Sequence, residues 1–170
     1  MSGLLNVTGS VSGILGTTVG TPSGGTVLQV MHDETSGWNS FGSTGSYAAV
    51  SGFDVAFDCK SATSKVLFQC VCAGAGKASG NTQLGFRLAG PGGLSVVLSE
   101  GHHYTGSTVM SMSQGFWMYI HDHNQSVGTT LTYIPQFNSA NSIYQAFIGQ
   151  YVATLGDVKH ICTITEFEPQ

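Results

Sequence analysis

The stretch that decides the fold is KVLFQCVCA at residues 65–73, where bulky apolar side chains recur at every second position. Alternate residues of a strand lie on the same side of a sheet, so a period of two predicts a strand with one apolar, buried face. The same alternation recurs at residues 47–57, 83–89 and 129–137. In the first stretch, the buried face carries Val66, Phe68, Cys70 and Cys72.

Working outward from this stretch, short strand patterns follow one another along the chain with turn-rich segments between them. Their spacing of about 8–12 residues is typical of a β-sandwich or barrel, and no window longer than about two turns has the apolar spacing of a helix. The fold class is therefore all-β, with about 8–10 short strands. The predicted strands are Thr26–His32, Tyr47–Phe57, Lys65–Ala73, Gln83–Ala89, Leu94–Ser99, Ser107–Ser113, Phe116–Asp122, Thr129–Phe137, Ile143–Gly149 and Lys159–Glu168.

The chain carries few charges: nine acidic and five basic side chains in 170 residues, or 8%. Globular proteins average about 25%, so a charged helical surface is excluded. The hydrophobic fraction of 41% excludes a disordered chain. A net charge of −4 with scattered cations argues against nucleic acid as a partner. We also expect no membrane partner, because no stretch approaches the ~20 apolar residues of a membrane span.

Residues 1–25 contain no charged side chain, and Gly, Ser and Thr separate single apolar residues. We interpret them as an extended N-terminal arm that packs on its own domain or on a neighbour, and residues 26–170 as the β-sandwich domain. The arm lacks a basic n-region and is interrupted by Gly and Ser, so it is not a secretory signal. The candidate assembly anchors are Leu4, Leu5, Val7, Val11, Ile14 and Leu15.

The four cysteines favour buried, reduced thiols in a chain folded in a cytosol. A Cys59–Cys162 disulfide or a metal site are the alternatives. Paired zinc-ligand spacings are absent, so we expect no metal and no cofactor. His121 and His123 would share one strand face and bind a metal only with a third ligand. The favoured interpretation of this segment is a strand that ends in a loop.

Several loops contain side chains suited to a ligand or partner. No serine lies in a Gly-x-Ser-x-Gly elbow or beside an evident base and acid, so we expect no enzyme. Arg87, inside a strand pattern, is expected to pair with Glu100, Glu166 or Glu168, either across a sheet or between subunits. The candidate ligand or partner residues are Trp38, His102, His103, Tyr104, His121, Asp122 and His123.

The order of several segments between residues 27 and 168 resembles a family of small virion proteins from marine tailed bacteriophages. That family has a tryptophan, a Ser-Ala/Thr-Ser-Lys segment, a strand with a central Arg, a Thr-Thr-x-Tyr strand and a terminal Ile-Thr-x-x-Glu segment. The chain departs from it at residues 120–123, IHDH, where the family's loop carries Ser-Pro. The matching segments here are Trp38, VSGFDV at 50–55, KSATSKVL at 60–67, GFRL at 85–88, YIHD at 119–122, TTLTY at 129–133 and ICTITEF at 161–167.

The resemblance implies a jelly-roll-like, non-enzymatic domain on the outside of a virus particle, assembled in the host cytoplasm. It implies a homo-oligomer, a trimer, in contact with other virion proteins such as the major capsid or tail proteins. A capsid decoration or cement protein is favoured, because the chain is short and has no shaft repeat. The alternative is a tail fibre, knob or receptor-binding tip whose loops bind a host-surface glycan.

Overall fold

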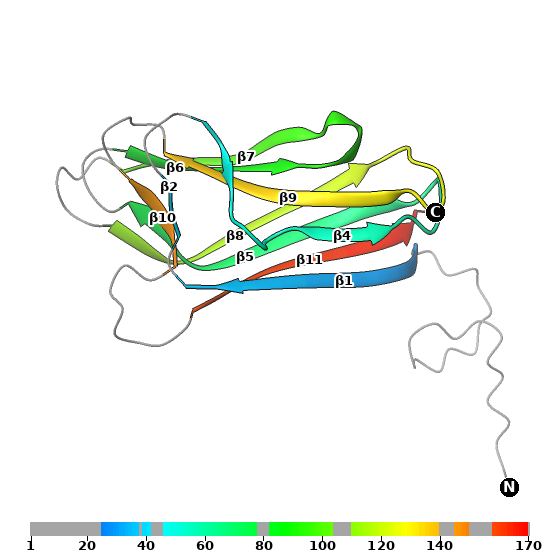
Figure 1. Ribbon diagram of the computed structural model, residues 1–170, viewed down its shortest axis with the longest axis horizontal. Helices are drawn as coiled ribbons and strands as arrows, with labels where there is room; N and C mark the ends of the chain where they lie inside the picture. Colours follow the sequence, from blue (N-terminus) through cyan, green and yellow to red (C-terminus); the bar gives the residue numbers. More distant parts are fainter. Residues whose placement is uncertain are drawn as a thin grey trace, which may run out of the picture.

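The computed structural model describes residues 25–37, 39–41, 46–77, 82–103, 110–139, 145–149 and 158–169, without the side chains of 101–103 and 110–113. This part of the chain consists of β-strands and one 3-10 turn, Pro91–Gly93. The strands form two antiparallel sheets that pack face to face (Figure 1). The all-β prediction is therefore confirmed. No helix in the described ranges has the length and apolar character needed to cross a membrane.

The first sheet is four strands wide. Its order is β1 (Thr26–Ser36), β11 (Lys159–Glu168), β5 (Lys65–Lys77) and β8 (Met110–Asp122). Two short strands continue this order at one end of the sheet, because β10 (Ala146–Ile148) pairs with the last residues of β5. Beside β10 lies β2 (Asn39–Phe41), which follows β1 along the chain.

The second sheet is also four strands wide. Two short strands, β3 (Ala48–Ala49) and β4 (Val55–Asp58), pair one after the other with β9 (Thr130–Ser139). On its other side β9 pairs with β6 (Thr82–Ala89), and β6 pairs with the edge strand β7 (Ser95–His103). All of these pairings are antiparallel.

The order of strands in the two sheets is that of a jelly roll. If β1 with β2, β3 with β4, and β10 with β11 are each counted as one strand, the sandwich has eight strands, four in each sheet. Of the connections between consecutive strands, only β6 to β7 stays within one sheet; every other connection crosses between the sheets. Two interlocked Greek keys of this kind define the double-sheet jelly roll. The predicted jelly-roll-like sandwich is thus confirmed.

Aromatic side chains from both sheets fill the space between them. The Phe86 ring lies flat against Trp117 with centroids 4.3 Å apart, and its edge meets Phe137 at 5.2 Å. Phe68 stacks on Phe86 from the opposite sheet. Large aromatic side chains contribute much of the hydrophobic stabilisation of a core. The four residues predicted for the buried face of the 65–73 stretch are fully buried here.

Several predicted strand bounds differ from the structure; β5 and β7, for example, run past their predicted ends to Lys77 and His103. Two further differences concern where one strand is divided from the next, and each has a local cause. The predicted strand Tyr47–Phe57 is broken by a turn at residues 51–52, where Gly52 has a φ of +68°. The two predicted strands Ser107–Ser113 and Phe116–Asp122 form one strand, β8. Gly115 lies inside it because the Trp117 ring covers the position that a Cβ of residue 115 would occupy. The glycine therefore makes room for a core ring and does not mark a turn.

Within the chain, Arg87 does not form the predicted ion pair. Arg87 lies directly opposite Gln136 on β9 and donates from Nε to its Oε1 at 2.8 Å. The guanidinium also lies over the Tyr47 ring, 4.5 Å from the centroid. Tyr47 then donates its hydroxyl to Glu100 at 3.1 Å. Burial and this acceptor raise the pKa of Tyr47 to about 12, so the phenol keeps its proton.

The glycine at which β5 changes partner from β11 to β10 gives a test of the fold. Gly74 has a φ of +84°, and a Cβ there would lie 2.5 Å from the carbonyl oxygen of Gly149. We expect Gly74→Ala to lower the free energy of unfolding by about 2–4 kcal/mol, from left-handed backbone strain plus the steric overlap. Urea denaturation followed by circular dichroism measures it.

The matched control is Gly128→Ala, because Gly128 has a φ of +81° but no atom within 4 Å of its Cβ position. This control should cost only the strain, about 1–2 kcal/mol. Equal losses for the two variants would contradict the close approach of Gly74 to Gly149.

Candidate functional site

The outward side of the first sheet carries an apolar surface. On β8, Phe116, Met118 and Ile120 are each more than half exposed, at 55%, 55% and 54%. The strand register aligns them with outward-facing residues of β5 and then of β11 and β1. We call this surface the outer apolar face. It consists of Val30, Leu67, Val71, Phe116, Met118, Ile120 and Ile161.

The charged side chains near this face lie at its margins. Lys65 and Asp122 form an ion pair at 3.2 Å at one end of the sheet. Lys159 and Glu34 form another at 2.9 Å towards the opposite end. Exposed pairs of this kind stabilise a fold by less than about 1 kcal/mol. A contiguous exposed apolar surface rimmed by polar groups is typical of an interaction site.

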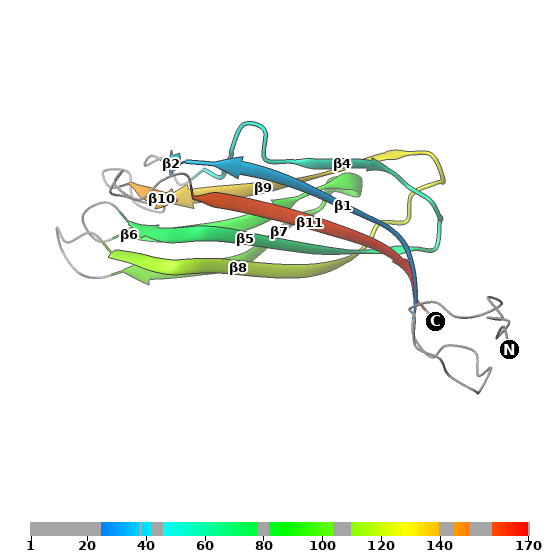
Figure 2. The same cartoon turned by 90° about the horizontal axis from the view of Figure 1, so that it is seen from below.

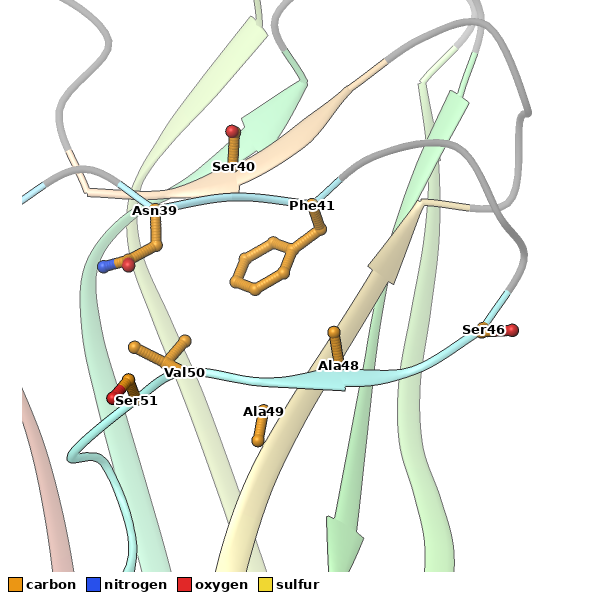
Figure 3. Close-up of a pocket in the computed structure, with 8 residues that line it drawn as sticks. All are labelled: Asn39, Ser40, Phe41, Ser46, Ala48, Ala49, Val50 and Ser51. Atoms are coloured by element: carbon orange, nitrogen blue, oxygen red, sulfur yellow. The ribbon is translucent and has the colours of Figure 1, made fainter.

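A shallow pocket of about 310 Å³ lies at the end of the sandwich where β2 and β10 meet. In Figure 3 the Phe41 ring and the Val50 side chain point towards one another, whereas the Ser40 and Ser46 hydroxyls point away. Its lining comes from β2, β3 and the residues beside β3, and includes no ionisable side chain among those described. The pocket therefore holds neither an acid nor a base for catalysis.

At the opposite end of the sandwich, the Glu166 carboxylate is fully buried and accepts hydrogen bonds from four groups. The donors are the backbone amides of Lys60 at 2.9 Å and Ser61 at 3.3 Å, the Ser64 hydroxyl at 2.6 Å and the side-chain amide of Gln29. Burial alone would raise the pKa of Glu166. The hydrogen bonds outweigh burial and lower that pKa below its ordinary value. The carboxylate is thus ionised and connects β1, β11 and the loop before β5.

His123 and Cys59 complete this buried polar cluster. The backbone amide of Gln125 donates to Nδ1 of His123 at 3.0 Å, so the neutral ring carries its proton on Nε2. Nε2 lies 3.0 Å from the Ser64 hydroxyl and donates to it. The Cys59 thiol donates to the Ser61 carbonyl oxygen at 3.1 Å, and burial raises the pKa of this thiol.

The cluster has the residue types of a metal site. Ligand atoms of Cys59, His123 and Glu166 lie within 4.8 Å of one another. A metal binds a thiolate and an unprotonated ring nitrogen, so it would have to displace the protons that the Cys59 thiol and His123 use here in hydrogen bonds. The cluster does not have the order of a catalytic triad, because Ser64 donates to the acid and accepts from the histidine, the reverse of the catalytic order. It serves to join strands and loops.

The three candidates at residues 121–123 have different environments in the structure. His121 is half-buried and its Nδ1 lies 2.8 Å from the Tyr133 hydroxyl; burial and nearby His123 lower its pKa. His123 is only 3% exposed, so its side chain is not at the surface. Asp122 is exposed and pairs with Lys65. The two histidines both point into the sandwich, yet each has its own hydrogen-bond partner. All four cysteines are buried and unpaired, in agreement with the favoured interpretation.

The remaining candidates lie outside the described residues: the arm anchors, Trp38 and Tyr104, together with the side chains of His102 and His103. They stay predictions. Sequence reasoning missed both the outer apolar face and Glu166. The signal for the face was the run FWMYI at residues 116–120, which is apolar on both sides of its strand. No local signal marks Glu166, because its donors come from distant segments.

The buried carboxylate gives a pH-dependent prediction. Because the pKa of Glu166 is lowered in the folded state, its ionised form stabilises the fold above the ordinary value of 4.5. This contribution is lost as the pH falls through the lowered pKa. Glu166→Gln should lower the free energy of unfolding by about 2–3 kcal/mol at pH 7 and flatten its decrease between pH 5 and pH 3. Urea titrations at several pH values measure both effects.

The matched control is Glu168→Gln, two residues along the same strand, whose carboxylate accepts a hydrogen bond from the Thr63 hydroxyl at 3.1 Å and from no other side chain in the described ranges. It should change stability by less than about 0.5 kcal/mol. A Glu166→Gln protein as stable as this control would contradict the ionised, fully hydrogen-bonded carboxylate.

Comparison with known proteins gives no family. No protein-family model and no curated protein matches the sequence. Among solved structures, the chain is similar to the T13 viral particle of infectious bursal disease virus, with 12% identity over 82% of this chain and 38% of that one, at a TM-score of 0.43. It is also similar to the VP2 subviral particle of that virus, with 9% identity over 84% and 42%, at 0.38. The chain spans about two fifths of the length of these proteins, and agreement this low assigns no function.

Proposed function

We propose that the chain is a non-enzymatic structural protein of a virus particle, a capsid decoration or cement protein that forms a homo-oligomer, a trimer, on the particle exterior. The outer apolar face carries this proposal. Exposed large apolar side chains lie on β8, β11 and β1, and the half-buried Leu67 and Val71 lie between them on β5. The polar residues that share this face, Gln69, Thr163 and Thr165, are uncharged, and the ion pairs lie at the margins. Assembly would remove such a surface from water, with a gain of about 25 cal/mol for each Å² of apolar area.

The jelly roll is compatible with this role, because viral capsid domains use it, as do lectins and cupins. A fold by itself does not assign a function, so the function has to be argued from the chemistry of the side chains. Among the described residues, the Cys59–Ser64–His123–Glu166 cluster uses its protons and lone pairs in internal hydrogen bonds. That chemistry supports a structural role for it.

The uncharged arm supports anchoring to neighbouring subunits. Full burial of a Leu or Ile side chain contributes about 1.5–3 kcal/mol, and Leu4, Leu5, Ile14 and Leu15 are available for it. This gain has to exceed the conformational entropy lost when the arm becomes ordered. Four such side chains contribute about 6–12 kcal/mol together, which offsets the ordering of only a few residues around them, so we expect anchoring to be confined to short segments of the arm.

A second candidate is a tail fibre, knob or receptor-binding tip. The pocket between β2 and β3 favours it, because an aromatic ring, Phe41, lies beside neutral polar groups such as Asn39. Neutral polar groups beside an aromatic ring suit a sugar better than a charged ligand. A glycan array distinguishes the two roles: a specific carbohydrate ligand supports the tip, and the absence of any ligand supports decoration.

The main test is attachment to the particle. Quantitative mass spectrometry of purified particles should find hundreds of copies for a decoration protein, whereas a handful would indicate a tail component. Deletion of residues 1–25 should abolish rebinding to particles that lack the protein. As a control for length, Leu4, Leu5, Ile14 and Leu15 are replaced by Ser in the full chain, which should abolish rebinding equally. Undiminished rebinding of both variants would contradict anchoring through the arm.

A further inference from the structure

Strand β8 forms an open edge of the first sheet. Within the described ranges, β8 is hydrogen-bonded only on the side that faces β5. From Gln114 to Asp122 it pairs with β5 residue by residue and without a bulge. Figure 2 shows β8 along one border of the molecule. The opposite edge of this strand therefore offers backbone donors and acceptors for another strand.

The other edge strands carry devices that discourage pairing, whereas β8 does not. In β1, the register shifts between Val27 and Gln29, and the acidic Asp33 and Glu34 follow. In β7, the register against β6 is also irregular. β4 has only four residues. Bulges, charges and short length are the usual protection of sheet edges. Between Gln114 and His121, β8 has no charged residue, no proline and no bulge.

The side chains along this edge suit a copy of the same strand. We propose that two copies of the chain pair β8 with β8 in antiparallel orientation, about a two-fold axis at Met118. In this register Met118 lies opposite Met118 of the second copy, and Phe116 lies opposite Ile120 of the second copy. Gln114 lies opposite Asp122 of the second copy. Apolar side chains thus meet apolar side chains, and the single charge meets an amide.

Neighbouring registers are poorer. With the axis at Trp117, Gln114 would lie opposite Ile120, which places an amide against an exposed apolar side chain. An axis at Tyr119 would place Phe116 opposite Asp122, which removes water from the exposed Asp122–Lys65 ion pair without offering it a hydrogen bond. A contact in which one patch meets itself is the isologous interface of a two-fold dimer. This self-complementarity identifies the occupant of the edge as a second copy.

The paired sheets would be continuous and eight strands wide, with the outer apolar faces of both copies side by side. This inference goes beyond the proposed function, because it holds for a head protein and for a tail protein alike. If the subunit is a trimer through another surface, the β8 contact joins one trimer to the next. Two-fold pairing through β8 then at least doubles the mass of the monomer or of the trimer.

Disulfide trapping tests the register. Met118→Cys should form a disulfide-linked dimer under mild oxidation, because directly opposed strand residues have Cα atoms about 4.5–5.5 Å apart. Phe116→Cys alone should not, since the two positions would be about 13 Å apart along the strands. A mixture of Phe116→Cys with Ile120→Cys should cross-link. The four native cysteines are buried and give little background.

The control is Val127→Cys, which is 65% exposed in the turn after β8. Met118→Cys should cross-link about tenfold faster or more, because paired thiols have a high effective concentration. Equal rates for the two variants would overturn the proposal. Efficient cross-linking of Phe116→Cys to itself would also overturn it. So would faster cross-linking of Met118→Cys after deletion of residues 1–24, because this would mean that those residues cover the β8 edge.

A second measurement does not depend on a disulfide. Light scattering of Met118→Lys should give at most half the mass of the unmodified protein, because the two lysine charges would face each other at the axis and repel. Met118→Ser should give an intermediate average mass. An unchanged mass for Met118→Lys would overturn β8 pairing. If β8 pairing is lost but the protein rebinds particles normally, the proposed function stands. If β8 pairing is observed but the protein does not bind particles, only the proposed function is contradicted.

Discussion

The double pairing of β5 is the constraint on which the rest of the structure depends. β5 pairs with β8 along one edge, and with β11 and then β10 along the other. Its inward side chains alternate without exception from Val66 to Cys72 and lie against the aromatic rings of the second sheet. A shift by one residue would turn this entire set towards water. The register of β5 therefore determines which residues of its neighbours face the core.

Alternation predicted the class of fold and the inward face of β5, and the sequence of strands and turns also predicted the bounds of β11 at Lys159–Glu168. These patterns failed where the backbone responds to distant groups. Gly115 follows a serine-rich segment and resembles a turn in the sequence, but it lies beneath the Trp117 ring. The break after Ala49 depends on where β9 ends one pairing and begins another. A local pattern carries no information about which strand lies on the other side.

The same limit applies to the candidate site. The sequence drew attention to His121 and His123 because they are close neighbours in a charge-poor chain. In the structure each forms a hydrogen bond with a different side chain: His121 with Tyr133, and His123 with Ser64. The outer apolar face was hidden because a strand that is apolar on both sides is typical of one buried on both sides. Only the sheet order reveals that β8 has nothing above its outward side among the described elements.

The pairing of β1 with β11 has a mechanical consequence. The first residue of β1, Thr26, lies opposite Glu168 near the end of the chain, and β1 runs from there along the whole of β11. Consider a force that pulls the residues before Gly25 along the strand axis while the rest of the sandwich is held in place. This force loads the ladder of hydrogen bonds between β1 and β11 in shear. All of these backbone hydrogen bonds then share the force. A pull between the two ends of the chain would instead open the same ladder one bond at a time. A subunit held by its N-terminal residues would therefore resist detachment best when the load is applied to its sheets.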